Sequence, residues 1–320
     1  MKGQTNLPLV SIVTPSFNQG EFIEATIQSV LAQDYPNIEY IVIDGASTDA
    51  TVNVLQRYAE KISWISEPDR GQSDAINKGF LRARGDILAW MCSDDLYEPD
   101  TVSQVIEHFR QHGTTDMVYG ECQYIDSQGQ PIGKYPSSEF DISSLLPFCF
   151  IPQPTVFMRR SLLDCVGMVD ADLQYAMDLD LWARVAMSGR IDFMPQVLAR
   201  YRLHDGTKTV SSSSAVEREG IRVRERYLGD PNFRKCLGAS SRRVAGIVYL
   251  KAAAFHFYEG DFAKTCRYMI KAAAAHPANR ELWQLPFNAW RAIGKKRRRK
   301  LFSDSADGRI DHLVGDRPAP

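Results

Sequence analysis

The stretch of residues 88–100, LAWMCSDDLYEPD, joins an apolar run to two adjacent aspartates. The apolar run 87–91 has the composition of a buried strand, and Asp94 and Asp95 follow it before the next helix begins. Two neighbouring carboxylates repel, so each tends to raise the other's pKa unless a cation or several hydrogen-bond donors lie between them. A polar turn can form without two adjacent carboxylates, so turn formation alone does not explain Asp94 and Asp95.

Three similar apolar runs precede this one, with a helical pattern after each. The expected strands are 10–14, 40–43, 62–65 and 87–91. The expected helices are an apolar stripe over 22–31, a helix that Ser47 or Thr48 caps and that runs to about Arg57, and a helix over about 73–84. These spacings suit right-handed parallel crossovers. The sequence predicts an α/β fold with a Rossmann-like, mostly parallel sheet flanked by helices.

Polar residues cluster where these strands end. The segments are 14–18, 44–49, 67–74 and 93–95. In open parallel sheets ligands bind beyond the carboxyl ends of the strands. Turn chemistry alone accounts for any one of these segments, because Asp, Ser, Asn and Gly favour turns and caps. Four successive segments with the same character favour a shared binding site.

The rest of the chain alternates less regularly. We expect a helix over 101–110, short strands near 117–125 with a hairpin turn at DSQGQ, a strand at 155–158, a helix at 177–187 and a strand at 198–203. The Ser-rich stretch HDGTKTVSSSS is the expected boundary or mobile loop. A C-terminal all-helical extension follows, with helices at about 215–227, 242–258, 263–275 and 280–293. Its segment around Gly260 resembles a single tetratricopeptide-like hairpin, which we interpret as an accessory docking element.

Bulk composition limits the class of protein. The 320 residues carry 38 basic and 39 acidic side chains, so the whole molecule has no general attraction for nucleic acid. The six cysteines are scattered, which fits reduced thiols better than a disulfide framework or a zinc site. The first residues lack the layout of a secretory signal, and no apolar stretch is long enough to cross a bilayer. These features predict a cytoplasmic protein that could touch a membrane from that side.

Three segments resemble the family-two glycosyltransferases, which use nucleotide sugars and have the glycosyltransferase-A fold. They are VSIVTPSFNQGEFIEATIQSVLAQDYPNIEYIVIDGASTDATV, EPDRGQSDAINKGFLRARGDILAWMCSDD and YAMDLDLWARVAMSG, and the match covers about residues 9–211. The resemblance implies a glycosyltransferase domain at 1–211, with a nucleotide-binding half at about 8–115 and an acceptor half at about 116–211. The helical extension at 215–293 and a basic, flexible tail at 294–320 lie outside it.

The resemblance also implies roles for individual residues. Thr14 and Pro15 would contact the nucleotide, and Asp44 would bind the base. Arg70 and Asp74 map onto the nucleotide cradle. The alternative for Arg70 is a surface charge, and for Asp74 an acid at a helix N-terminus.

The acidic pair after the fourth strand is the counterpart of the DxD-type motif in that family. It implies that Asp95 ligates Mn²⁺ or Mg²⁺ and that Asp94 holds ribose or a metal-bound water, with Cys92 where an acid or Asn is common. A divalent ion held by carboxylates neutralises the charge that develops on a leaving diphosphate. The alternative is that Asp95 caps the next segment.

AMDLDLW offers two candidates for the base that deprotonates an acceptor hydroxyl. On a helix Asp178 shares the inward stripe of Leu181 and Trp182, whereas Asp180 falls on another face and can pair with Arg184. We therefore expect Asp178 to be the buried acid and the base, in agreement with the family's Glu-Asp motif. Its alternative is a helix-starting Asp that satisfies backbone donors. The family resemblance and the single base imply inversion at the anomeric carbon.

Basic residues occur at two further places. Along the strand near residue 200, a period of two puts Arg200, Arg202 and His204 on one face. The resemblance implies that Arg202 and His204 lie near pyrophosphate and metal, with His204 a metal ligand; a strand-end His without a role is the alternative. The tail 295–300, near Trp283, Phe287 and Trp290, suits an anionic membrane surface, with a solvated tail or weak nucleic-acid contact as alternatives.

The predicted activity is metal-dependent, inverting transfer of a sugar from a nucleoside diphosphate, with UDP as the first choice, to an acceptor hydroxyl. The acceptor would be a saccharide or lipid-linked saccharide of the cell envelope. One alternative is a catalytically inactive nucleotide-sugar-binding scaffold. A nucleotidyltransferase is disfavoured, because VTPSFNQGEF lacks a Gly-rich phosphate loop with a Lys after the first strand.

Overall fold

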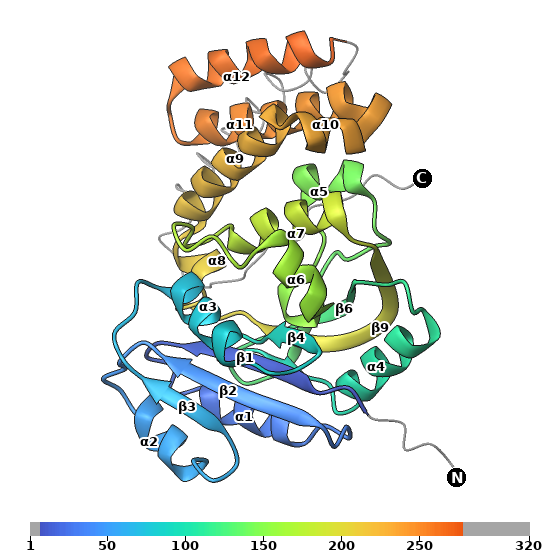
Figure 1. The fold of residues 1–320 in the computed structure, drawn as a ribbon. Helices are drawn as coiled ribbons and strands as arrows, with labels where there is room; N and C mark the ends of the chain where they lie inside the picture. Colours follow the sequence, from blue (N-terminus) through green and yellow to red (C-terminus); the bar gives the residue numbers. More distant parts are fainter. Residues whose placement is uncertain (1–6, 278–320) are drawn as a thin grey trace. The chain divides into compact units, whose positions relative to one another are not determined.

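Four parallel strands form the first half of the sheet in the computed structural model, which describes residues 7–277. They are β1 (Val10–Ser16), β2 (Ile38–Asp44), β3 (Ser63–Ser66) and β4 (Ile87–Trp90), arranged in the order β3-β2-β1-β4 (Figure 1). All four predicted strands are present. Their β-branched and aromatic residues suit a sheet that is covered on both faces.

The second half of the sheet is mixed. It consists of β5 (Leu96–Tyr97), β6 (Met117–Ile125), β7 (Pro131–Lys134), β8 (Phe157–Arg159) and β9 (Ile191–Arg202). Within the described residues the strands form one nine-stranded sheet in which β4 continues to β8, β6, β9 and β5, and β7 pairs with β6. The β8 strand runs antiparallel to β4 and β6, while β6 and β9 are parallel. The predicted hairpin turn lies between β6 and β7.

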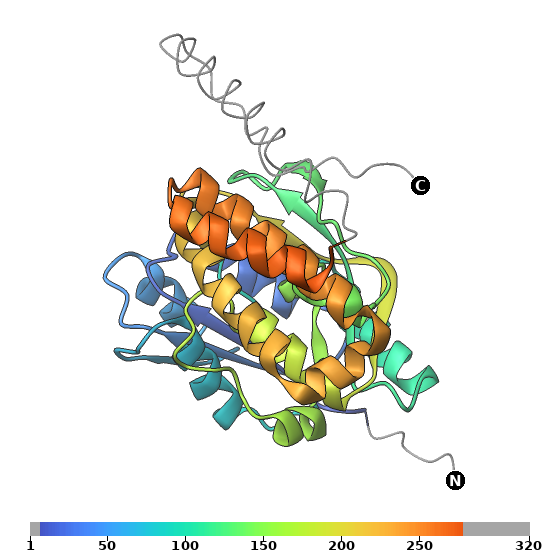
Figure 2. The same ribbon diagram turned by 90° about the horizontal axis from the view of Figure 1, so that it is seen from above.

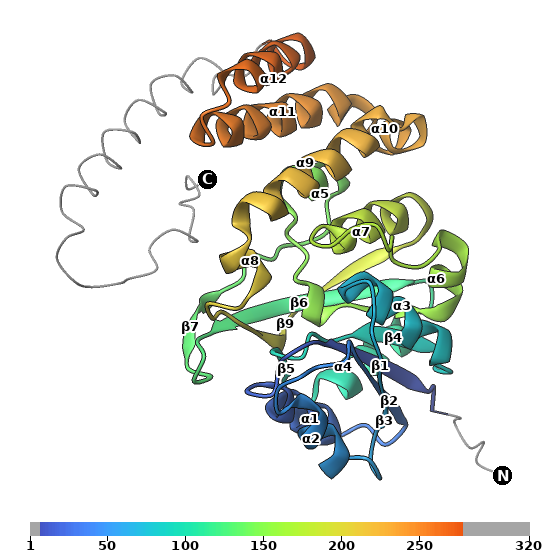
Figure 3. The same ribbon diagram turned by 90° about the vertical axis from the view of Figure 1, so that its left-hand side faces the viewer.

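One face of the sheet is covered by α1 (Ile23–Leu31), α2 (Thr51–Arg57) and α4 (Thr101–Gln111), as Figure 3 shows from the side. Ile27, Leu55 and Val105 of these helices belong to the same buried cluster as Ile12 and Val42 of the sheet. Fully burying side chains of this kind stabilises the fold by about 1.5–3 kcal/mol each. These three helices therefore pack against one face of the parallel strands and hold them in place.

The opposite face is covered by α3 (Gln72–Arg82), α6 (Arg160–Val166) and α7 (Met177–Ser188) (Figures 1 and 3). Trp90 lies between Phe80 of α3 and Trp182 of α7, with ring centroids 5.9 and 5.4 Å away. Gly79 brings α3 so close to β1 that a Cβ there would lie 2.2 Å from Val13 Cγ1. Both helices are therefore fixed against the strands whose ends form the site.

Most of the Ser-rich stretch is helical, so the loop predicted there ends at residue 207. It contains α8 (Lys208–Ser211) and the start of α9 (Ser213–Gly229). Serine has only a modest intrinsic helix propensity, but Ile221, Val223 and Tyr227 of α9 are buried, and tertiary packing stabilises a helix of this kind. Contacts made far along the chain decide the structure of this stretch.

The remaining elements of the first unit are short. They are α5 (Ile142–Phe148), α10 (Pro231–Leu237) and the 3₁₀ turns at Gln153–Thr155 and Gly238–Ser240. The chain divides into two compact units that meet at Val248 and Tyr249, so α9 and α10 belong to the first unit. The sequence analysis expected the first domain to end at 211 and the helical extension to begin at 215, and both positions lie well before this division.

The described part of the second unit is a helical hairpin. It is formed by the end of α11 (Ser241–Tyr258), which begins in the first unit, and by α12 (Phe262–Ala275), which lies alongside it (Figure 2). Gly260 adopts a φ of 80° in the turn, and Leu250 packs against Ala272. Both helices lie within one residue of their predicted ends. The expected helix at 280–293 and the basic tail at 294–320 lie outside the described residues.

Candidate active site

A cavity of about 550 Å³ lies at the carboxyl ends of the parallel strands. All four polar segments predicted for this edge contribute to it, and the segment after β9 closes another side. The lining residues are Pro15, Ser16, Phe17, Gln19, Gly45, Asp69, Gly71, Gln72, Ala75, Cys92, Ser93, Asp94, Asp95, Tyr201, Gly206, Thr207 and Lys208. A cavity of this size, formed by the ends of several strands, is suited to a small ligand.

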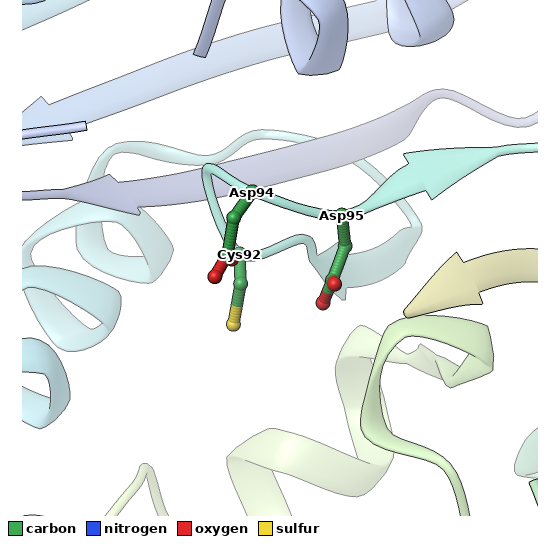
Figure 4. Close-up of side chains that lie close together, drawn as sticks. All are labelled: Cys92, Asp94 and Asp95. Atoms are coloured by element: carbon green, nitrogen blue, oxygen red, sulfur yellow. The ribbon is translucent and has the colours of Figure 1, made fainter. Parts of the chain in front are cut away.

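The acidic turn after β4 forms part of the cavity wall. Cys92, Asp94 and Asp95 point to the same side of the turn (Figure 4), and one ligand atom of each lies within 4.8 Å of the others. Asp95 is 2% exposed, and the Arg202 N–H donates to its Oδ1 at 2.9 Å. Burial and the neighbouring Asp94 hold the pKa of Asp95 well above its usual range. Two carboxylates this close, with so few donors, suit a bound cation.

The chemistry of these three groups fits a hard divalent ion. Carboxylate oxygens suit Mg²⁺ and Mn²⁺. Burial and the two aspartates raise the pKa of the Cys92 thiol well above its ordinary value, so the thiol is protonated and a poor ligand. Asp94 and Asp95 are therefore the residues of this group that would hold the ion.

His204 contacts the acidic turn but is engaged at both ring nitrogens. The Gly206 N–H donates to Nδ1 at 3.2 Å, and Nε2 lies 3.1 Å from Asp94 Oδ2. Since Nδ1 accepts, the neutral ring carries its proton on Nε2 and donates it to Asp94. Direct ligation of a metal by His204 requires the ring to give up one of these contacts, and that role remains a prediction.

The residues predicted at the first two strand ends divide into lining and supporting groups. Pro15 lines the cavity, whereas Thr14 is buried and its Oγ1 lies 3.0 Å from the Tyr40 hydroxyl. Asp44 is also buried and accepts hydrogen bonds from Ser47 N–H and Ser66 Oγ, at 2.9 and 2.6 Å. In this arrangement Asp44 orders the loop beside the cavity, and the neighbouring Gly45 lines it.

Ser47 connects the loops that follow β1 and β2. The sequence analysis expected Ser47 or Thr48 to cap α2, and the structure shows no side-chain cap there. The Ser47 hydroxyl accepts from the Asn18 N–H at 2.7 Å and donates to Asp44. The residue at the start of α2 is Ala50, without a side-chain cap. Asn18 and Ala46 have φ angles of 51° and 61°, a backbone conformation that costs roughly 1 kcal/mol or more outside glycine. The inter-loop hydrogen bonds offset this strain and hold the edge of the cavity.

Arg70, predicted in the nucleotide cradle, and Arg202, predicted near the pyrophosphate, have other partners. Arg70 is 74% exposed at its side chain and pairs with Asp74 at 3.3 Å in the first turn of α3. Arg202 donates to the backbone carbonyls of Asp94 and Ser127, at 2.9 and 3.0 Å. Neither arginine, nor Asp74, is among the residues that line the cavity. The residue of β9 that lines it is Tyr201, on the face opposite Arg202.

The acidic start of α7 corrects one expectation. Asp180, not Asp178, is the more buried acid, at 2% exposed. Asp180 contacts Arg184 as predicted, at 2.9 Å, and also Arg226 and the Tyr227 hydroxyl, at 2.9 and 2.8 Å. Contacts with Arg226 and Tyr227 of α9 bury Asp180, whereas the sequence analysis expected Asp178 to be the buried acid.

Asp178 is partly buried and has few direct partners. The Leu179 N–H donates to its Oδ1 at 2.7 Å. Burial raises the pKa of Asp178 to about 6, against the lowering effects of that hydrogen bond and of the Arg224 charge. An acid with a pKa near neutrality is suited to general base catalysis. Asp178 does not line the cavity directly.

The segment that leads into α7 joins Asp178 to the cavity wall. Ser73 Oγ of α3 donates to the Leu173 carbonyl, and Gln174 Nε2 donates to the Arg70 carbonyl at 3.2 Å. Glu219 of α9 is buried and accepts the N–H groups of three successive residues before α7, at 2.6–3.0 Å, namely Gln174, Tyr175 and Ala176. The position of Asp178 is thus fixed from both α3 and α9.

The sequence analysis missed several lining residues. Lys208 lies in the Ser-rich stretch, and Gln72 begins α3. The Ser16 hydroxyl is buried, has no hydrogen-bond partner among the described residues, and belongs to a residue that lines the cavity, so it is available to a ligand there. Phe17 lines the cavity while 60% exposed. Ser16, Phe17 and Gln72 lie in the predicted polar segments 14–18 and 67–74, whereas Lys208 lies in a stretch that the sequence analysis interpreted as a boundary or mobile loop.

Comparison with known proteins identifies the family. Residues 11–167 match the model of glycosyl transferase family 2. An uncharacterized glycosyltransferase of Rickettsia typhi is 30% identical over 68% of this chain and 71% of its own length. One of Mycobacterium tuberculosis is 30% identical over 81% of this chain and 96% of its own length.

Solved structures share the fold. The Staphylococcus aureus protein TarS, residues 1–349 in complex with UDP-GlcNAc, aligns with a TM-score of 0.58 and 15% identity, over 84% of this chain and 92% of that one. The Pyrobaculum calidifontis mannosyltransferase PcManGT, in complex with GDP-Man and Mn²⁺, gives 0.57 and 21%, over 86% and 89%. Among residues 7–277, no helix has both the length and the hydropathy to cross a bilayer. The chain belongs to glycosyltransferase family 2 and is a transferase with the glycosyltransferase-A fold.

Proposed function

We propose that the protein transfers a sugar from a nucleoside-diphosphate sugar to an acceptor hydroxyl, in a metal-dependent reaction that inverts the anomeric carbon. UDP is the proposed nucleoside diphosphate of the donor. The observation that carries this proposal is the cavity of about 550 Å³ with Asp94 and Asp95 in its wall. A nucleotide sugar needs a cavity of this class, and its diphosphate needs a cation beside it.

The donor side of the cavity supports a nucleotide. Phe17 offers an exposed ring on which a base can stack, and the Ser16 hydroxyl offers an unused donor and acceptor. The two solved neighbours are complexes with UDP-GlcNAc and GDP-Man, so a UDP-linked or GDP-linked donor follows by analogy. Thr14, Asp44 and Asp74 then act through the loops they order.

Asp95 and Asp94 would hold Mn²⁺ or Mg²⁺. When bound, the ion would supply positive charge that stabilises the leaving diphosphate. The role of the protein is to hold two carboxylates together, through the Arg202 N–H on Asp95 and His204 on Asp94.

Asp178 is the proposed base. Its raised pKa, its few direct partners and its place at the start of α7 support acceptance of a proton from the acceptor hydroxyl. Attack on the face opposite the leaving group in a single displacement gives inversion.

The acceptor is proposed to be a saccharide or lipid-linked saccharide of the cell envelope. TuaG of Bacillus subtilis, named for teichuronic acid biosynthesis, is 29% identical over 68% of this chain and 88% of its own length. The basic tail 295–300 would bring the protein to an anionic membrane surface. Removal of this tail should weaken binding to anionic vesicles in a salt-sensitive way; equal partitioning would exclude the membrane contact.

A thermal-shift screen tests the donor proposal directly. The protein is heated with UDP, GDP and their sugars, each with and without Mn²⁺. At a ligand concentration 100 times Kd, binding stabilises the folded state by about 2.7 kcal/mol and raises the Tm accordingly. A shift that needs both nucleotide and metal supports the proposal, and no shift with any nucleotide would contradict it.

A further inference from the structure

The charged side chains that line the cavity are three carboxylates and one amino group within the described part of the chain. They are Asp69, Asp94, Asp95 and Lys208. The diphosphate of a nucleotide sugar carries two negative charges, and acids alone would repel it. Even with a divalent ion at the acidic turn, Lys208 is the lining side chain that can attract a phosphate oxygen.

The neighbouring arginines are engaged elsewhere. Arg202 donates to main-chain carbonyls, Arg70 pairs with Asp74, and Arg200 pairs with Glu98 at 2.6 Å. Redirecting any of them would leave a carbonyl or carboxylate without its donor. Lys208 lines the cavity and these arginines do not, so Lys208 is better placed than they are to bind a phosphate there.

The present partners of Lys208 are neutral. Its Nζ donates to Gln72 Oε1 at 2.9 Å and to the Gln174 carbonyl at 3.2 Å, and it lies 5.7 Å from the centre of the Tyr175 ring. Hydrogen bonds between two charged groups are roughly twice as strong as those between neutral ones. A phosphate oxygen can thus replace a glutamine oxygen at this amino group with a gain in energy.

The backbone on both sides of Lys208 is anchored. Thr207 is buried, and its Oγ1 accepts from the His204 N–H at 3.0 Å and donates to the Arg202 carbonyl at 3.2 Å. The Thr209 hydroxyl lies 2.9 Å from that of Tyr201. The lysine is therefore held at the cavity before any ligand binds, which lowers the entropic cost of its contact.

We propose that Lys208 binds the diphosphate of the donor in the cavity that it lines together with the acidic turn. This inference rests on the proposed function and adds a specific phosphate-binding residue to it. Lys208 is exposed and lines the cavity. The protein around its amino group removes part of the hydrating water and thereby lowers the pKa of Lys208. A cation partly stripped of water interacts more strongly with an anion than a fully hydrated one.

Calorimetric titrations of the full chain with uridine, UMP and UDP at fixed Mn²⁺ test the proposal. Lys208→Met should weaken UDP binding by about tenfold or more, the loss expected for one charge-assisted hydrogen bond, with less effect on UMP and almost none on uridine. Lys208→Arg should retain most of the UDP affinity. Lys134→Met, which removes an exposed lysine of β7 from its pair with Glu121, is the control for net charge.

The outcomes separate the two proposals. UDP affinity unchanged in Lys208→Met, or equal losses for uridine and UDP, would overturn the role of Lys208 while leaving the function intact. If the unaltered protein binds neither UDP nor GDP with Mn²⁺, the proposed function itself falls. Loss that grows with the number of phosphates supports both.

Discussion

Asp95 and Asp180 are equally buried, with 2% of each residue exposed, yet their surroundings differ. Asp180 contacts two arginines and a tyrosine hydroxyl, whereas Asp95 has one backbone N–H and a second carboxylate beside it. A buried charge is stable only when paired and hydrogen-bonded. Burial alone therefore says little about the role of an acid; the number of donors around it distinguishes a structural acid from a candidate ligand.

The largest expected effect is on activity at the acidic turn. Asp95→Asn keeps the size of the side chain and an oxygen for the Arg202 N–H, but it removes the charge that would hold a metal. We expect Mn²⁺-dependent transfer or donor hydrolysis to fall by about 10³-fold or more. Asp100→Asn, which makes the same change at an exposed position before α4, should retain activity.

Stability gives an independent measurement on the same pair of variants. The unaltered protein and Asp100→Asn should gain Tm on addition of Mn²⁺ with UDP, and Asp95→Asn should not. An active Asp95→Asn variant with a normal metal response would contradict the assignment of Asp95.

The next effect concerns the partly buried acid of α7. Asp178→Asn should lower kcat by about 10²–10⁴-fold, the usual contribution of a general base, with little change in UDP affinity. In the unaltered enzyme, kcat should rise with pH through about 6, as Asp178 loses its proton. A variant with unchanged kcat would remove Asp178 from the proposed mechanism.

The same substitution should stabilise the fold at neutral pH. The pKa of Asp178 is about 6 in the folded protein against 3.8 ordinarily, so the folded state binds this proton more tightly and loses stability as pH rises from about 4 to 6. Asparagine cannot ionise. Above pH 6 we expect Asp178→Asn to be more stable by on the order of 1–3 kcal/mol, and below pH 4 equally stable, by urea unfolding.

Asp180 should behave in the opposite way. Asp180→Asn leaves Arg184 and Arg226 without their shared carboxylate, and we expect a loss of about 2–4 kcal/mol in the free energy of unfolding. Activity per folded molecule should change much less. Normal stability with lost turnover would exchange the proposed roles of Asp178 and Asp180.

The sequence predicted the parallel half of the sheet and the edge at which the cavity lies, because those depend on apolar runs and strand order. It did not predict β5, which has two residues and exists through pairing with β9, or the helices in the Ser-rich stretch. It predicted the contact of Asp180 with Arg184 but not the burial of Asp180 by Arg226 and Tyr227 of α9. Pairing of β5 with β9 and contacts between α7 and α9 join residues that are far apart in sequence, and such contacts leave no local pattern.

The smallest effect should come from Glu219, which orders the segment before α7. Glu219→Gln keeps one acceptor oxygen but removes a charge from three N–H donors, and we expect a loss of about 1–2 kcal/mol in stability and a few-fold fall in kcat. The Glu219 charge also raises the pKa of Asp178, although less than burial does. Its removal should therefore shift the acid limb of the pH–rate profile to lower pH.

That shift distinguishes positioning from simple destabilisation. Glu217→Gln, on the same helix and paired with Arg224 at 3.3 Å, changes net charge equally, whereas the hydrogen bonds to the segment before α7 come from Glu219. Because Arg224 lowers the pKa of Asp178, freeing it from Glu217 should leave the acid limb in place or lower it only slightly, without the loss of stability. If Glu219→Gln loses stability but keeps the acid limb of the unaltered enzyme, then Glu219 supports α7 without influencing the proposed base, and the electrostatic link between α9 and Asp178 fails.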